Sequence, residues 1–200
     1  MIPKIDSVES LVNNESLKHV QDHISAVESL PIECIPQIDK LAHILFDSFR
    51  SGNTLFFCGN GGSASQAQHL AAEFIGRYKE DRNPLKSIAL TSDTSVITCI
   101  SNDYSYHQVF SRQLDGLASS GDVLIALSTS GTSPNIIDVI QKARDLNVYC
   151  ALFTGGLYKD EQLADLIIKV NSSSTAIIQE CHLLLGHTLC AHVESLLFKS

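Results

Sequence analysis

Residues 54–63 read Thr-Leu-Phe-Phe-Cys-Gly-Asn-Gly-Gly-Ser, and residues 122–133 read Asp-Val-Leu-Ile-Ala-Leu-Ser-Thr-Ser-Gly-Thr-Ser. Each stretch is a short apolar run that ends in a loop of small and hydroxylated residues, and a helical pattern follows each loop. Buried strands that lead through such loops into helices are typical of a parallel sheet covered on both faces. The two stretches therefore predict an α/β fold.

The rest of the chain repeats this alternation. Five β-rich runs are separated by helical patterns, and they are Thr54–Cys58, Ser87–Leu90, Asp122–Ser128, Val148–Phe153 and Asp165–Val170. We expect a five-stranded parallel sheet flanked by helices, which is a three-layer sandwich. Apolar spacing from Ser7 to Ser51 predicts two preceding helices, with breaks near Pro31 and Pro36. A last helix is expected from Thr175 to Lys199.

Length and composition limit the classes of protein that fit. With 200 residues and 44% apolar content, we expect a single domain, in which residues 1–51 form a helical lead-in and residues 52–200 form the α/β core. The net charge of −8 argues against a general nucleic-acid surface. Neither a signal peptide nor a membrane-spanning run is expected, which predicts a soluble cytoplasmic protein. The charged stretch Arg77–Arg82 is interpreted as a solvated helix end or loop.

The two loops have the composition of a phosphate site. They are Gly59-Asn-Gly-Gly-Ser63 and Ser128-Thr-Ser-Gly-Thr-Ser133. In parallel sheets, ligands bind beyond the carboxyl ends of the strands, where helix N-termini carry partial positive charge. Ser133 is expected to be an N-cap with Pro134 at the first helical position. The loops could hold a small phosphate through backbone N–H groups and hydroxyls, although the second loop alone could equally be an ordinary solvated turn.

The first loop also fits a dinucleotide-binding pattern, through Gly59, Gly61 and Ala64. That pattern requires an acidic residue at the end of the second strand, where it binds the ribose. Here the second predicted strand is followed by Thr91-Ser92 before Asp93. A nucleotide cofactor is therefore not expected.

Two pairs of polar residues lie on predicted helices. His69 and Glu73 are four residues apart and share one helix face, while Gln179 and His187 lie two turns apart on the last helix. Together the four side chains could ligate zinc or a similar divalent ion. Without a metal, Glu73 could act as a base and His187 as an acid. A purely structural hydrogen bond between helices is the third interpretation.

Several motifs resemble the phosphoheptose isomerases, which are sugar isomerases of the SIS fold. The motifs are Cys58-Gly-Asn-Gly-Gly-Ser63, Gln68-His-Leu-Ala-Ala-Glu-Phe-Ile-Gly-Arg-Tyr78, Ser101-Asn-Asp-Tyr104, Val109-Phe-Ser-Arg112, Gly121-Asp-Val-Leu124, Ser128-Thr-Ser-Gly131 and Ile178-Gln-Glu-Cys-His182 through His187. The resemblance runs from about Ser51 to Glu194. It implies the isomerisation of sedoheptulose 7-phosphate to D-glycero-D-manno-heptose 7-phosphate, the first step toward the heptose of bacterial lipopolysaccharide or capsule.

The resemblance also implies residue roles. Glu73 and His187 would be the catalytic acid/base pair, and His69, Glu73, Gln179 and His187 would hold one zinc ion per subunit. The phosphate would lie against Ser63, Ser128, Thr129, Ser130 and Ser133, and the sugar against Asn60, Gly61, Gly62, Glu73, Asn102, Asp103 and Gln179. The chain departs from the motifs of many relatives at Ala72, Ser105 and Ala176-Ile177.

The resemblance further implies a homotetramer whose interface includes the N-terminal helices. Two other functions remain open at this point. One is a non-catalytic SIS-domain protein that binds a protein partner, as the replication-initiator-associating protein does. The presence of both Glu73 and His187 argues against it, because that type of protein lacks the acid and the second imidazole. The other is an isomerase or sensor of a different phosphosugar.

Overall fold

The computed structural model describes residues 14–198, and its centre is a five-stranded sheet with every strand parallel. The strands are β1 (Leu55–Gly59), β2 (Ser87–Ala89), β3 (Val123–Leu127), β4 (Tyr149–Gly155) and β5 (Leu166–Val170). Their order in the sheet is β2-β1-β3-β4-β5. All five predicted strands are confirmed, with ends that differ by no more than two residues. The two stretches quoted above contain β1 and β3. These strands are neighbours, with β2 beyond β1 and with β4 and β5 beyond β3, so both lie inside the sheet.

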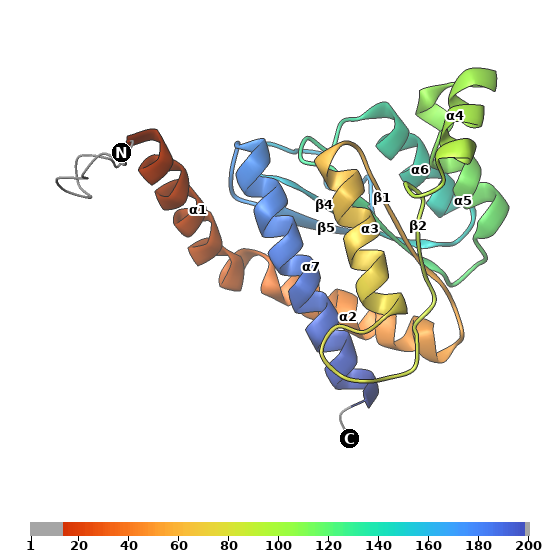
Figure 1. Cartoon of the computed structure of the whole chain (residues 1–200), viewed down its shortest axis with the longest axis horizontal. Coiled ribbons are helices and arrows are strands. Elements are labelled where there is room, and N and C mark those ends of the chain that lie inside the picture. The colour runs from red at the N-terminus through yellow and green to blue at the C-terminus, as the bar shows by residue number, and fades with distance from the viewer. Residues whose placement is uncertain (1–13, 199–200) are drawn as a thin grey trace, which may run out of the picture.

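Helices cover both faces of the sheet (Figure 1). One face carries α2 (Ile35–Arg50), α3 (Gly62–Ile75) and α7 (Thr175–Phe198), and α1 (Asn14–Glu33) packs beside them. The other face carries α5 (Ser111–Leu117) and α6 (Pro134–Asp145), with α4 (Thr94–Asp103) and the 3-10 turn η2 (Tyr106–Gln108) at its edge. The predicted three-layer α/β sandwich is confirmed.

Alternation along the strands explains the two hydrophobic cores. Leu55 and Phe57 of β1 belong to the cluster under α2, α3 and α7, whereas Phe56 and Cys58 belong to the cluster under α5 and α6. Successive side chains of a strand point to opposite faces. A strand buried on both faces must therefore be apolar at every position, which is why β1 and β3 lack the alternation of apolar and polar residues seen in half-exposed strands.

The break expected near Pro31 is absent, because α1 continues through Pro31 to Glu33. Proline removes the hydrogen bond that a backbone N–H at this position would donate to the carbonyl four residues earlier, and the helix ends two residues later. The chain interrupts the helix at Cys34 instead. Pro36 then lies in the first turn of α2, where backbone N–H groups have no partner within the helix. The predicted lead-in from Ser7 to Asn13 lies outside the described residues.

Helix α7 is apolar around most of its circumference. Among residues 14–198 it is the one helix that is long and apolar enough to cross a bilayer by length and composition alone. It packs against α2, α3 and the sheet, and Leu185, Leu189 and Val193 are almost completely buried. Its apolar composition is explained in part by this packing, since a helix that contacts other helices and the sheet on several sides buries more than one face.

The interpretation of Arg77–Arg82 as a solvated segment is wrong for Arg82. Its side chain is only 2% exposed and forms an ion pair with Glu194 of α7, with Nε 2.9 Å from Oε1. Periodicity analysis missed this contact because the partner lies 112 residues further along the chain. The segment crosses the C-terminal part of α7 before the chain enters β2.

Candidate active site

The two predicted loops meet at the carboxyl ends of β1 and β3. These strands are paired in register from Leu55 and Val123 to Gly59 and Leu127, so the loops that follow them leave the sheet side by side. They enclose a cavity of about 260 Å³. Its lining includes most of the residues expected to bind the substrate, namely Asn60, Gly61, Gly62, Ser63, Ser128, Thr129, Ser130, Ser133 and Gln179, together with Leu127 and Thr175.

The glycines of the first loop allow a close approach between helices. Gly61 has φ of +55°, a backbone conformation that other residues rarely adopt. At Gly62, a Cβ atom would lie 2.8 Å from the amide atoms of Gln179. The N-terminus of α3 can therefore lie directly against the first turns of α7. Gln179 Nε2 is 3.4 Å from Ser63 Oγ, which connects the two helices at the cavity.

The second loop presents several hydroxyls and an open helix N-terminus. The backbone N–H of Gly131 donates to Ser128 Oγ at 3.1 Å, and that of Thr132 donates to Ser130 Oγ at 3.2 Å. Ser133 is the N-cap of α6, as predicted, but its side chain makes no capping hydrogen bond. The Ser133 hydroxyl thus remains available at a helix end that favours an anion.

Sequence reasoning missed Asn135, which is 2% exposed and joins the two loops. Asn135 and Asn60 exchange two amide hydrogen bonds, each of 2.8 Å. Tyr106 also donates its hydroxyl to Asn60 Oδ1 at 2.9 Å. Asn60 is therefore oriented from two other segments. A buried asparagine in the first turn of a helix resembles any polar residue near a cap, so the pattern gave no signal of this pairing.

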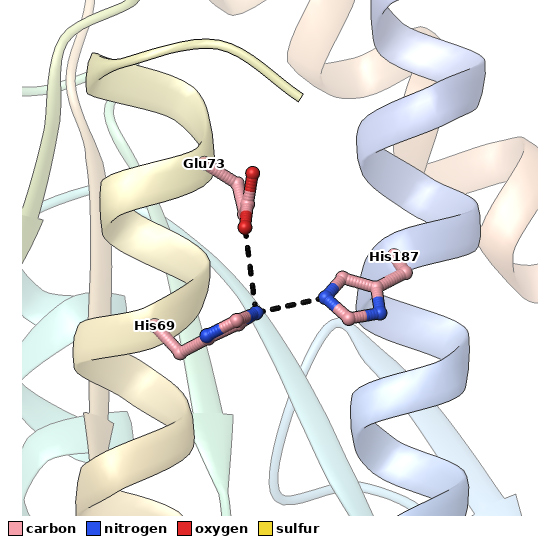
Figure 2. Close-up of side chains that lie close together, drawn as sticks. All are labelled: His69, Glu73 and His187. Atoms are coloured by element: carbon pink, nitrogen blue, oxygen red, sulfur yellow. Dashed lines mark hydrogen bonds and ion pairs between the residues drawn. The ribbon is translucent and has the colours of Figure 1, made fainter. Parts of the chain in front are cut away.

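Three of the four proposed metal ligands converge between α3 and α7 (Figure 2). His69 Nε2 lies 2.8 Å from His187 Nε2 and 3.4 Å from Glu73 Oε1. His69 and Glu73 extend from one face of α3, and His187 faces them from α7. The structure thus brings donor atoms of the two catalytic candidates, Glu73 of α3 and His187 of α7, to within 4.8 Å of each other.

The surroundings of His187 favour its neutral form. Burial lowers its pKa, the nearby His69 lowers it further, and Glu73 partly opposes the shift. The ring of Tyr78 is stacked on the His187 imidazole, with centroids 5.5 Å apart and an interplanar angle of 22°. A neutral imidazole can accept a proton or bind a metal ion, whereas a protonated one can do neither.

The geometry of this cluster fits a divalent metal ion. One donor atom from each of His69, Glu73 and His187 lies within 4.8 Å of the other two. Two imidazole nitrogens and a carboxylate oxygen form the donor set of many zinc sites that keep a position open for substrate. Gln179 lies two turns before His187 on α7 and lines the loop cavity, so it connects the cluster to the phosphate loops.

Asn102 and Asp103 are not part of this arrangement within one chain. They lie at the C-terminal end of α4, are exposed, and contact each other, with Asn102 Nδ2 donating to Asp103 Oδ1 at 2.7 Å. Neither residue lines the loop cavity. Their expected contact with the sugar stays a prediction.

Comparison with known proteins shows what kind of site this is. Residues 18–155 match the model of the SIS domain family. A phosphoheptose isomerase from Bradyrhizobium is 40% identical over 97% of this chain and 98% of its own length, and one from Akkermansia muciniphila is 44% identical over 88% and 91%. The structure of a phosphoheptose isomerase from Francisella tularensis superposes with a TM-score of 0.85 at 30% identity, over 91% of this chain and 97% of that one.

The fold and its loops thus define an SIS domain. Within that class, the chain belongs to the phosphoheptose isomerase family. Four of the motifs that carried the resemblance, in residues 58–63, 68–78, 128–131 and 178–187, contribute residues to the loop cavity or to the cluster between α3 and α7.

Proposed function

We propose that this protein isomerises sedoheptulose 7-phosphate to D-glycero-D-manno-heptose 7-phosphate, an aldose–ketose interconversion. The observation that carries the proposal is the placement of an acid/base cluster, His69, Glu73 and His187, beside a cavity built from two phosphate-type loops. Gln179 links the two parts from α7. Membership of the phosphoheptose isomerase family supports the same reaction.

The loop cavity would bind the phosphate end of the sugar. Hydroxyls of Ser63, Ser128, Thr129, Ser130 and Ser133 line it, and two helices begin at its wall. Partial positive charge at these helix ends and free backbone donors can stabilise a phosphate without a lysine or arginine. This agrees with a chain of net charge −8. Asn60, Gly61 and Gly62 would contact the sugar above the phosphate.

Glu73 and His187 would move the protons. In the forward direction, the Glu73 carboxylate removes a proton from C1 of the ketose and returns it to C2, so that the carbonyl passes from C2 to C1 through an enediol. The neutral His187 ring accepts the proton of the O1 hydroxyl and then, as the imidazolium, donates it to O2, so each proton lost is replaced. General acid–base catalysis of this kind contributes about 10²- to 10⁴-fold to the rate.

We also propose that His69, Glu73, Gln179 and His187 hold one zinc ion per subunit. A bound zinc ion would act as a Lewis acid that polarises the sugar carbonyl. The convergence of the three donor atoms within 4.8 Å and the lowered pKa of His187 support this donor set. His69 contacts both Glu73 and His187, so it would help to hold these two side chains in place when the ion binds.

The proposal extends to the assembly and its setting. We propose the homotetramer that the family resemblance implies; in support of an interface on the N-terminal helices, α1 exposes a row of apolar side chains, Leu17, Val20 and Ile24, each about half exposed. An apolar face on an N-terminal helix is typical of a surface that a second copy covers. We place the protein in the cytoplasm, at the first step toward a bacterial lipopolysaccharide or capsule heptose. No nucleic-acid, nucleotide or membrane partner is proposed.

The direct test is to incubate the purified protein with sedoheptulose 7-phosphate, with and without added zinc, and to follow the products by NMR. Formation of the aldose 7-phosphate by wild type, with a strong loss in the E73Q variant, supports the proposal. Folded, zinc-loaded protein that forms no product would point to another phosphosugar or to the partner-binding alternative. Comparing zinc-free and zinc-loaded samples shows whether the ion contributes to turnover.

A further inference from the structure

The carboxylate of Glu194 lies under the segment that connects α3 to β2. It is 2% exposed and accepts three backbone hydrogen bonds, from the N–H groups of Tyr78 at 2.9 Å, Lys79 at 3.0 Å and Glu80 at 3.2 Å. Burial alone would raise its pKa, but these three N–H groups and Arg82 outweigh burial and lower it. Glu194 is therefore an ionised anchor inside the protein.

Arg82 completes this anchor and connects it to α3. Its Nε donates to Glu194 Oε1 at 2.9 Å. Its Nη1 and Nη2 atoms donate to the backbone carbonyls of Phe74 and Glu73, each at 2.8 Å. Carbonyls in the last turn of a helix lack partners within the helix, and arginine satisfies two of them here. One of the two belongs to the proposed catalytic base.

The anchored segment also reaches the second half of the catalytic pair. Tyr78, whose N–H is bound by Glu194, stacks its ring on His187. We call residues 76–83 the strap. The strap thus contacts the Glu73 backbone through Arg82 and covers one face of the His187 ring through Tyr78.

We propose that Glu194 and Arg82 are positioning residues for the isomerisation, and that they act by holding the strap so that Tyr78 orients His187 toward His69 and Glu73. This inference rests on the proposed function and adds residues to it that touch neither the loop cavity nor the substrate. The stacked ring limits rotation of the imidazole, and the arginine ties the strap to the last turn of α3. Reacting groups misplaced by about 1 Å can lose 10²-fold in rate.

A structural explanation alone is weaker. Replacing a buried ion pair with apolar residues is often neutral or stabilising, so stability does not by itself require a buried carboxylate with four donors. An apolar strap would still close over α7, but it could not fix three consecutive N–H groups in one place. A fixed backbone at residue 78 sets the position from which the Tyr78 side chain extends. The Tyr78 ring then stacks on the His187 imidazole.

The test compares steady-state kinetics of Y78A, Y78F, E194Q and the Y78A/E194Q double variant, in the zinc-loaded full chain. We expect kcat to fall about 10- to 100-fold in Y78A and in E194Q, with KM near the wild-type value. Y78F keeps the ring and should retain near-normal kcat. Because Glu194 acts through Tyr78, the double variant should be no slower than the slower single variant.

Two results would overturn the proposal. One is a Y78A protein with wild-type kcat, and the other is a double variant whose loss is the product of the two single losses. Y78A leaves the Glu194 anchor intact, so it tests the strap even if E194Q does not fold. The control for folding is circular dichroism with thermal unfolding of each variant.

Amide hydrogen exchange separates this proposal from the proposed function, because it needs no substrate. The N–H groups of residues 78–80 should be protected in wild type and should exchange much faster in E194Q. Rapid exchange in wild type would contradict the anchor. If wild type forms no aldose while these amides behave as expected, the assigned reaction is wrong and the anchor geometry is right.

Discussion

The two ends of the site are built in opposite ways. The proposed phosphate end consists of two short stretches, residues 59–63 and 128–133, at the ends of neighbouring strands, and each stretch is continuous in sequence. The chemical end joins His69 and Glu73 of α3 to His187 of α7, more than a hundred residues away. The first uses backbone donors and hydroxyls, whereas the second uses titratable side chains held by packing.

This difference separates binding from chemistry. Loops at strand ends and helix N-termini bind the part of the substrate that does not react, and they do so with groups that do not titrate near neutral pH. Changes at the phosphate end should therefore act mainly on KM. Changes between α3 and α7 should act mainly on kcat, because those groups are required in the transition state.

The largest effect is expected at the chemical end. E73Q removes the proposed base and H187A removes its proposed partner, so each should lower kcat by about 10²- to 10⁴-fold. Steady-state kinetics with sedoheptulose 7-phosphate measures this. KM should change little, because neither side chain lines the phosphate cavity. A well-folded E73Q protein with near-normal turnover would contradict the proposed role of Glu73.

A metal ion at the chemical end would depend on His69. H69A removes one of the three converging donors and should weaken zinc binding by roughly 100-fold or more, since zinc sites are built from three or four such ligands. Calorimetric titration of metal-free protein measures the affinity. H43A is a matched control, because His43 lies on α2 outside the cluster. Equal zinc affinity in H69A and wild type would exclude this donor set.

At the phosphate end, S63A should raise KM about tenfold and leave kcat nearly unchanged. Hydrogen bonds to charged groups contribute roughly 1.5–3 kcal/mol, and Ser63 lies at the wall of the cavity. S65A is the control on the same helix, because Ser65 is exposed and does not line the cavity. A loss confined to kcat in S63A would contradict the proposal that the loops act in substrate binding and the α3–α7 cluster in chemistry.

The hydrogen bonds between Asn60 and Asn135, which connect the two loops, should contribute to the free energy of unfolding. N135A leaves Asn60 without its two amide hydrogen bonds, so the free energy of unfolding should fall by about 1–3 kcal/mol. Denaturant unfolding of N135A and wild type measures the difference. N171A, at an exposed asparagine after β5, is the control. Unchanged stability in N135A would show that the pair is dispensable.

The smallest effect concerns pH. The folded pKa of Glu194 is lowered, so its contribution to stability is complete above the unfolded value of about 4.3 and is lost as the pH falls through the folded value. The stability difference between wild type and E194Q should therefore shrink below about pH 4. Urea unfolding from pH 3 to 7 measures it. A difference that grows on acidification would contradict an ionised Glu194.

The sequence predicted the sheet well, because a strand buried on both faces must be apolar throughout and the loops after β1 and β3 carry glycine and hydroxyl residues. It also suggested His69 with Glu73, since a spacing of four defines one helix face. It could not predict Asn135, Arg82 or Glu194. Their partners lie 75 and 112 residues away, and no local pattern encodes a contact made by packing.

The same limit explains the error at the charged segment. A run of charged residues after a helix is usually solvated, and most of Arg77–Arg82 fits that rule. The exception at Arg82 exists because α7 brings a buried carboxylate under the strap. Asn102 and Asp103 are assigned to the sugar by a family motif; they lie exposed at the end of α4, and their contact with the sugar stays a prediction.

The central claim is that one end of the site binds phosphate while Glu73 and His187 carry out the isomerisation. The most direct measurement is an NMR time course of wild type and E73Q with sedoheptulose 7-phosphate, at equal zinc loading and with substrate binding measured in parallel. We expect both proteins to bind the substrate, and only wild type to form the aldose 7-phosphate at an appreciable rate. Folded wild type that forms no aldose, or an E73Q variant that forms it as fast as wild type, would contradict it.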